Sequence, residues 1–204
     1  MPHLSIILGS SRRGRFADQV AAWVTSRVGT RSGVSFEVVD LREHPLPFLD
    51  QPPPAYTGRN YPNAHSARLG RILDRADGFL ILTPEYNHGY PAVLKNALDH
   101  TFVEWNRKPV AFVGWGNVGG ARAIEQLRLV AVELELAPLR HAVHILPDIV
   151  RALHQPGADP GQVFGSLDAR LAMLLDELLW WADALGAARG RSAQPPAGPG
   201  QGPA

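Results

Sequence analysis

The chain has 204 residues, of which 45% are hydrophobic and 19% are charged, so we expect one domain with a core of ordinary size. Its 20 Lys and Arg residues against 19 Asp and Glu give a formal charge of +1, which lacks the basic excess typical of nucleic-acid-binding proteins. The sequence contains no cysteine, which excludes disulfides, thiolate metal sites, iron–sulfur clusters and cysteine nucleophiles. A redox enzyme of this composition would need a bound cofactor.

The first apolar run of the chain ends at Gly9, which makes it too short for a signal peptide or a membrane span. We therefore expect a cytoplasmic protein with no membrane partner and no nucleic-acid partner. We also expect no metal site, because His141 and His144 are three residues apart on a predicted strand and would face opposite sides.

Short apolar runs alternate with stretches of helical periodicity along the chain, a pattern typical of repeated βα units. The predicted strands cover residues 4–8, 34–41, 79–83, 110–114 and 142–146. The predicted helices begin near Phe16, Ala64, Pro91 and Gly120, with a last helix after Ser166. This order predicts an α/β fold with a doubly wound, five-stranded parallel sheet of strand order 2-1-3-4-5.

Two segments are too rich in proline for regular structure. Six of the 18 prolines lie between Pro45 and Pro62, and four lie after Ala193. The first segment is predicted to be a long loop. Residues 186–204 contain five Gly and four Pro without a large apolar residue, so we expect a domain over residues 1–185 and a disordered tail over 186–204.

In open α/β sheets the ligand lies beyond the carboxyl ends of the strands, where the strand order reverses. The loop after the first strand, residues 9–16, combines serines, glycines and three arginines directly before a helix. Free N–H groups of the first helical turn, the helix dipole, hydroxyl groups and a guanidinium all favour a phosphate. A solvated basic loop is the alternative interpretation. The sequence lacks the pattern of a P-loop nucleoside triphosphatase.

The loop after the third strand runs from Pro84 to Pro91, and the two prolines hold its backbone in a defined conformation. Exposed N–H groups could bind the edge of a heterocycle, with Tyr86 or Tyr90 as a wall, although each tyrosine could equally pack within its own loop. For His88 a surface or packing role is the more common one.

Residues 114–119 match Gly-x-Gly-x-x-Gly, the pattern of dinucleotide-binding Rossmann domains. That pattern requires an acidic residue at the end of the next strand, about 20 residues on. Here Glu133 and Glu135 fall within the following predicted helix. We therefore interpret the glycines as permitting close approach of a ligand to the backbone.

Taken together, the loops at 9–15, 83–87 and 119–123, with residues 94–97 behind the second, resemble the NADPH-dependent FMN reductase family. The resemblance runs from the first strand to about Leu185, and three motifs occur in the same order as in the family. The resemblance implies a flavodoxin-like fold. The family includes quinone, azo-dye and chromate reductases. Two positions depart from the family pattern. Gly114-Trp115 stands where a Ser-Tyr pair is common, and Gly89 replaces a frequent serine. Both departures bear on the shape of the substrate pocket.

The resemblance implies FMN as cofactor and NADPH or NADH as electron donor. It assigns twelve residues to cofactor binding and no catalytic side chain, because the flavin carries the chemistry. The phosphate would be held by Ser10, Arg12, Arg15, Phe16 and Ala17. The flavin ring would be lined by Pro84, Glu85, Tyr86 and Asn87 and covered on its other side by Gly116, Gly119 and Gly120.

We therefore expect an NAD(P)H oxidoreductase that passes a hydride through FMN to a small acceptor such as a quinone, an azo compound or free flavin, and that forms a homodimer or homotetramer. The alternative is an FMN electron shuttle that oxidises no nicotinamide, although shuttles of this size are commonly acidic and this chain is not. A flavin-free binding module on the same fold is a third possibility.

Overall fold

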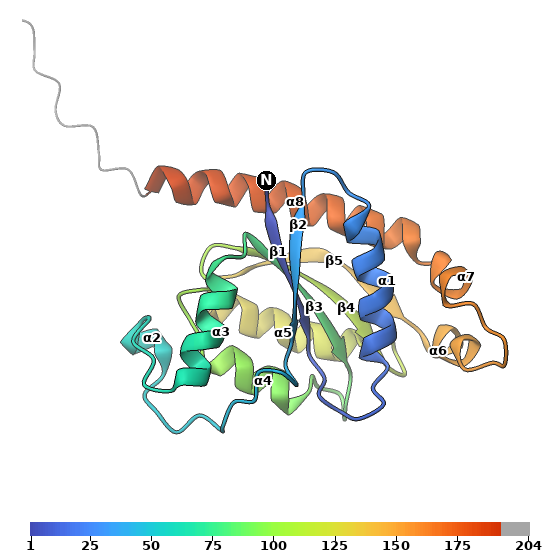
Figure 1. Ribbon diagram of the computed structural model, residues 1–204, viewed down its shortest axis with the longest axis horizontal. Coiled ribbons are helices and arrows are strands. Elements are labelled where there is room, and N and C mark those ends of the chain that lie inside the picture. Colours follow the sequence, from blue (N-terminus) through green and yellow to red (C-terminus); the bar gives the residue numbers. More distant parts are fainter. Residues whose placement is uncertain (193–204) are drawn as a thin grey trace, which may run out of the picture.

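The computed structural model describes residues 1–192 and places five strands in one parallel sheet of order β2-β1-β3-β4-β5 (Figure 1). The strands are β1 (His3–Leu8), β2 (Ser35–Asp40), β3 (Gly78–Pro84), β4 (Pro109–Trp115) and β5 (Ala137–Ile145). β3 and β4 are buried along their whole length, as expected for central strands covered on both faces. The predicted fold class and strand order are confirmed.

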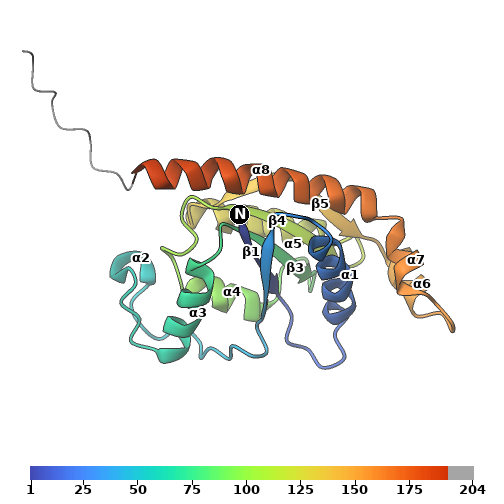
Figure 2. The ribbon, with the colours of Figure 1, turned by 45° about the horizontal axis from the view of Figure 1, so that its top comes forward.

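Helices cover both faces of the sheet. They are α1 (Ala17–Gly29), α2 (Pro54–Thr57), α3 (Ala64–Asp74), α4 (Ala92–Asp99), α5 (Ala121–Glu133), α6 (Pro147–Leu153), α7 (Pro160–Gly165) and α8 (Asp168–Ser192). One core cluster joins the sheet to α1, α7 and α8, and a second joins it to α3, α4 and α5. Figure 2 shows α8 lying across the sheet on the side of α1.

Three differences from the sequence-based expectation have local causes. β5 begins at Ala137 rather than 142, because an edge strand tolerates Pro138 and polar side chains that break the apolar pattern. α2, α6 and α7 were not predicted, and all three are short helices that begin with a proline. α2 lies within residues 45–62, so the expectation of a loop without regular structure was wrong for Pro54–Thr57. α8 continues through Gly186 to Ser192, so the expectation of disorder from residue 186 was wrong for 186–192. The rest of that predicted tail, 193–204, lies outside the described residues.

The proline-rich connection between β2 and α3 is fastened to the domain at its beginning. His100 is fully buried, and its Nε2 lies 2.9 Å from the Pro47 carbonyl while its Nδ1 lies 2.8 Å from the Ser66 hydroxyl. Asn96 also donates to the Pro47 carbonyl, at 2.9 Å. These bonds satisfy backbone groups that a proline-rich segment cannot pair in a ladder.

The loop after β1 is fixed by a buried arginine. The Arg15 side chain is 1% exposed, and its guanidinium contacts Asp40 at the end of β2 and Asp18 in the first turn of α1. It also donates to the Ser10 carbonyl. Burial alone would raise the pKa of Asp40, but hydrogen bonds from Arg15 and Arg42 lower that pKa to about 2.

The turn between β4 and α5 is fixed by close backbone packing. Gly120 has a φ of 75°, and a Cβ atom there would lie 2.8 Å from the Gly114 Cα and from the Trp115 nitrogen. A Cβ on Gly114 would lie 3.0 Å from the Gly119 carbonyl oxygen. The glycines therefore let the turn fold back onto its own strand, rather than serving only a ligand.

The lowered pKa of Asp40 predicts an acid-sensitive contribution to stability. Asp40 stabilises the folded state fully above its ordinary pKa near 4, and this contribution is lost as the pH falls toward about 2. Urea unfolding should show Asp40→Asn less stable than the parent chain by about 2 kcal/mol at pH 7, with the difference vanishing near pH 2.

Asp50→Asn is the matched control, because Asp50 is exposed and has no ion pair among the described residues. It should unfold like the parent chain at both pH values. A difference for Asp40→Asn that does not change with pH would contradict the role of the ion pair.

The packing of Gly120 predicts that Gly120→Ala destabilises the fold by about 3 kcal/mol, from left-handed strain plus backbone overpacking. Gly33→Ala is the control, since Gly33 has a φ of 74° but nothing within 4 Å of an added Cβ. It should cost only about 1 kcal/mol, the strain alone. Equal losses in chemical denaturation would refute the packing argument.

Candidate functional site

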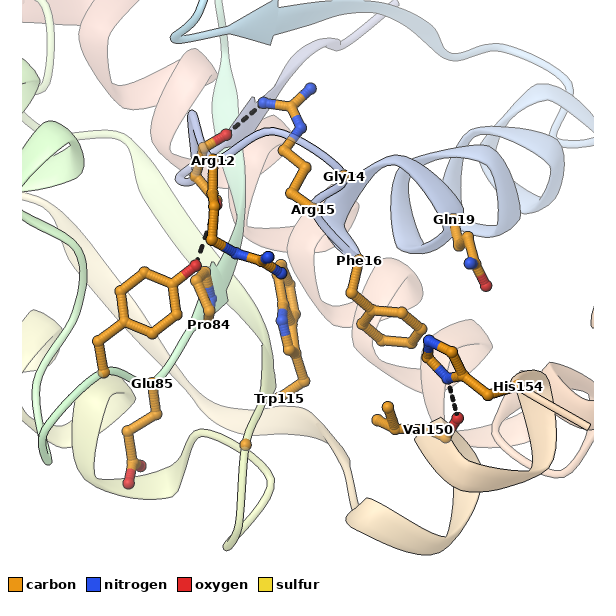
Figure 3. Close-up of a pocket in the computed structure, with 13 residues that line it drawn as sticks. Arg12, Gly14, Arg15, Phe16, Gln19, Pro84, Glu85, Trp115, Val150 and His154 are labelled. Atoms are coloured by element: carbon orange, nitrogen blue, oxygen red, sulfur yellow. Dashed lines mark hydrogen bonds between the residues drawn. The ribbon is translucent and has the colours of Figure 1, made fainter.

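A cavity of about 320 Å³ lies at the carboxyl ends of β1, β3 and β4, where the strand order reverses (Figure 3). This volume falls at the lower end of the range of small-molecule sites, about 300–1,000 Å³. The residues that line it are Ser10, Arg12, Gly14, Arg15, Phe16, Gln19, Pro84, Glu85, Tyr86, Trp115, Gly116, Val150 and His154.

One end of the cavity is built to receive an anion. No described residue accepts a hydrogen bond from the backbone N–H groups of residues 11–16, and α1 begins directly after them. Arg12 is exposed and forms no ion pair with any part of the chain that the structure describes. Free N–H groups, a helix N-terminus and an unpaired guanidinium together favour a phosphate.

Two of the loop's three arginines, Arg12 and Arg15, line the cavity, and their surroundings differ. The charge of Arg15 is already balanced by Asp40 and Asp18. Its side chain therefore holds the loop in shape, and of the two arginines that line the cavity Arg12 is the one whose charge remains available to a ligand (Figure 3).

The loop after β3 makes a tight turn. The backbone N–H groups of Tyr86 and Gly89 each donate to the other residue's carbonyl, and Asn87 and His88 between them have φ values of 50° and 69°. Two consecutive left-handed residues are the signature of a type I′ turn. The Tyr86 hydroxyl lies 3.3 Å from the Ser10 hydroxyl, which joins this loop to the loop after β1.

Glu85 anchors the same loop to α5. Its side chain is 3% exposed and accepts hydrogen bonds from the Arg122 guanidinium and, at 3.0 Å, from the Arg122 backbone N–H. Burial opposes ionisation, but these bonds bring the pKa of Glu85 below its ordinary value. Figure 3 shows the Glu85 carboxylate pointing away from Arg12, so its negative charge does not compete with an anionic ligand for the Arg12 guanidinium.

Aromatic side chains form the centre of the cavity wall. Trp115 is largely buried, and its ring meets the Phe16 ring edge to face at 5.9 Å. Phe16 in turn lies 6.2 Å from Phe164 of α7. On the side of Phe16, His154, the residue directly after α6, lines the cavity, with its Nδ1 donating to the Val150 carbonyl at 2.7 Å.

Eight of the twelve expected site residues line this cavity: Ser10, Arg12, Arg15, Phe16, Pro84, Glu85, Tyr86 and Gly116. The other four do not. Ala17 is fully buried in the core, Asn87 is exposed at the tip of its turn, and Gly119 and Gly120 pack against their own chain.

Sequence reasoning missed several lining residues. Gln19 belongs to no recognised motif. Val150 lies in the unpredicted α6, and His154 caps its C-terminal end. Trp115 was noted only as a departure from the family pattern. A polar residue three positions into the first helix is the one signal that could have pointed to Gln19.

The model of the NADPH-dependent FMN reductase family matches residues 2–148 of this chain. NAD(P)H-dependent FMN reductase C4B3.06c of Schizosaccharomyces pombe is 36% identical over 170 residues, which cover 81% of this chain and 85% of the relative. A 2-hydroxy-1,4-benzoquinone reductase of a Burkholderia species is 36% identical over 140 residues, covering 65% of this chain and 72% of the relative.

Among solved structures, the flavoenzyme NAD(P)H:(acceptor) oxidoreductase FerB of Paracoccus denitrificans superimposes with a TM-score of 0.67 at 20% identity, covering 90% of this chain and 98% of the other. At that identity the likeness concerns the fold alone. Within residues 1–192, no helix has the length and apolar character needed to cross a membrane.

These matches confirm the resemblance drawn from the three loops, and with it the expectation of an oxidoreductase. The chain belongs to the NADPH-dependent FMN reductase family, an oxidoreductase family whose cofactors are FMN and NAD(P)H.

Proposed function

We propose that the cavity binds FMN and that the chain passes a hydride from NAD(P)H through it to a small acceptor such as a quinone, an azo compound or free flavin. The observation that carries this proposal is the pairing, in one cavity, of an anion-binding end with an aromatic wall. Relatives named as a 2-hydroxy-1,4-benzoquinone reductase and as an FMN-dependent NADPH-azoreductase of Staphylococcus aureus support the range of acceptors.

The residues at the anion-binding end fit the phosphate of FMN. We assign Arg12 and the Ser10 hydroxyl to the phosphate oxygens, together with N–H groups of residues 11–16. Arg15, Phe16 and Ala17 contribute through the backbone that leads into α1. The buried side chain of Arg15 acts on the ligand only by fixing this backbone.

The residues at the other end fit a flat heterocycle. Pro84, Glu85 and Tyr86 present a fixed loop backbone on one side. Gly116 lines the same end, and its lack of a side chain lets its backbone pack against Glu85, because an added Cβ would lie 3.1 Å from the Glu85 Cβ. Asn87 holds the type I′ turn that shapes this loop. We assign Gly119 and Gly120 to the shape of the turn after β4 and not to direct contact.

Bound FMN supplies the redox chemistry, since it accepts a hydride from a nicotinamide and delivers electrons to an acceptor. The protein's part is to bind, orient and exclude water. Loop dipoles already fixed before the ligand arrives stabilise negative charge that develops on the ring at little cost in reorganisation. No side chain is needed as a general acid or base for this role.

The expected homodimer or homotetramer stays a proposal. The exposed Trp180 and Trp181, which pack edge to face on α8, support it, because exposed aromatic patches mark contact surfaces. The cytoplasmic location likewise remains a prediction.

The function is tested by the visible spectrum of the purified protein with FMN, followed by anaerobic NADPH. Flavin absorption that bleaches promptly with NADPH, and returns on addition of a quinone, is the expected result. Bound flavin that neither NADPH nor NADH bleaches would identify an electron shuttle instead, and failure to bind FMN would refute the assignment of the cavity.

The phosphate assignment predicts that Arg12→Ala weakens FMN binding about tenfold or more, because a charge-assisted hydrogen bond is lost. Arg13→Ala is the matched control: Arg13 is an exposed neighbour that does not line the cavity. Its FMN dissociation constant, measured by flavin fluorescence, should stay within about threefold of the parent value. If both variants weaken FMN binding equally, Arg12 acts only through its general positive charge and the phosphate assignment is refuted.

A further inference from the structure

The residues that line one side of the cavity have no role in the assignment of FMN made above. They are Gln19 of α1, Val150 of α6 and His154, the residue directly after α6. Val150 is apolar, whereas the side chains of Gln19 and His154 are polar and exposed. His154 also lies beyond residues 2–148, the segment that matches the family model, so its role has to be argued from this structure alone.

The packing of α6 leaves His154 at the cavity. Ile149, Val150 and Leu153 are partly buried and pack against the core cluster that joins the sheet to α1, α7 and α8. No residue of α6 is fully buried, so these three side chains are its main attachment to the core. The helix ends at His154, whose backbone N–H donates to the Arg151 carbonyl at 3.2 Å. The imidazole is thus carried at the end of a helix whose apolar side faces the core.

The His154 ring has one nitrogen bound and one nitrogen free. Its Nδ1 lies 2.7 Å from the Val150 carbonyl oxygen, which can only accept, so Nδ1 carries a proton. This bond fixes the orientation of the ring. Nε2 has no partner among residues 1–192, and Figure 3 shows it on the side of the ring that faces Phe16. The free nitrogen is therefore available to a ligand in the cavity.

Arg12 and His154 approach the start of α1 from two sides. Figure 3 shows Arg12 on one side of Phe16 and His154 on the other. Phe16 directly precedes Ala17, the first residue of α1, so the helix N-terminus lies between the two side chains. Arg12, Phe16 and His154 line the same cavity of about 320 Å³. A phosphate bound at the helix N-terminus would therefore meet nitrogen groups on both sides.

A phosphate monoester has the acceptor groups to use a further ligand. It carries three terminal oxygens, and its second ionisation has a pKa of about 6, so the monoanion and the dianion both occur near neutral pH. Nε2 of His154 accepts the proton of a monoanion or, as an imidazolium, donates to a dianion, and one hydrogen bond forms in either case. Arg12 and the loop N–H groups can bind two of the oxygens, which leaves one for His154.

From this arrangement we propose that His154 is a phosphate-binding residue of the FMN site, in contact with the phosphate on the side opposite Arg12. The inference rests on the proposed function, because it takes the phosphate of FMN to lie at the start of α1. It adds a side chain from outside the three loops to the cofactor site, and it makes the affinity for the phosphate depend on the segment after β5.

The test compares FMN with riboflavin, two flavins that differ by the phosphate alone. Dissociation constants of the full chain are measured by flavin fluorescence. His154→Ala should weaken FMN binding about tenfold, because a charge-assisted hydrogen bond is lost, and should leave riboflavin binding within about twofold of the parent value. Gln155→Ala is the matched control: Gln155 is an exposed neighbour that does not line the cavity, and its loss should change neither constant by more than about twofold.

Two conservative variants separate contact with the ligand from the bond to Val150. His154→Gln places an amide N–H about where Nε2 lies but gives up the bond to the Val150 carbonyl. His154→Asn places an amide N–H about where Nδ1 lies, so it can keep that bond but does not reach the ligand. A phosphate contact predicts that His154→Gln binds FMN within about threefold of the parent chain, whereas His154→Asn loses affinity as His154→Ala does.

The opposite order of these two variants would show that His154 acts only through Val150, and would overturn the proposal. An equal loss of FMN and riboflavin in His154→Ala, or no loss of either, would also overturn it. Thermal melting of each variant separates loss of binding from loss of fold. Because no nicotinamide is used, a chain that binds FMN but is not reduced by NADPH loses the proposed function and still tests His154. A chain that binds no FMN loses both.

Discussion

The site depends on one buried charge, the Arg15 guanidinium. A buried cation is tolerated only when paired and hydrogen-bonded, and here the partners come from three places in the chain: Asp40 at the end of β2, Asp18 in α1 and the Ser10 carbonyl. The guanidinium therefore holds the ends of β1 and β2 and the start of α1 in one arrangement. The anion-binding loop gets its shape from this ion pair, and the N–H groups that it leaves unpaired are free for a ligand.

The other two loops of the cavity are fixed in the same way, by contacts within the protein. Glu85 reaches α5 through Arg122, and Gly120 folds the turn after β4 onto its own strand. A ligand thus meets loops whose conformations are already set. Less of its binding free energy is lost to ordering the protein, and electrostatic stabilisation of the bound ring needs little rearrangement.

The sequence was sufficient to predict the order of strands and the edge of the sheet where the site lies, because apolar runs and loop composition are local signals. It could not tell which arginine of residues 12–15 carries a free charge, since Asp40 lies far along the chain from Arg15. Nor could it tell that Gly119 and Gly120 face their own strand and His144 rather than a ligand. Such facts depend on contacts between distant segments, which spacing does not encode.

The walls of the cavity divide into two parts of different origin. The three loops lie within residues 2–148, the segment that matches the family model, whereas Val150 of α6 and His154, directly after α6, lie beyond that segment. α7, which follows, is attached through Phe164, whose ring contacts Phe16 of the cavity and stacks on Trp23 of α1. A substitution in α6 or α7 can therefore reshape this side of the site while the loops that we assign to the phosphate and the heterocycle stay as they are. The proposed cofactor loops and the α6–α7 side of the pocket thus belong to separate segments, so we expect that the shape of this side can change without loss of the proposed cofactor site.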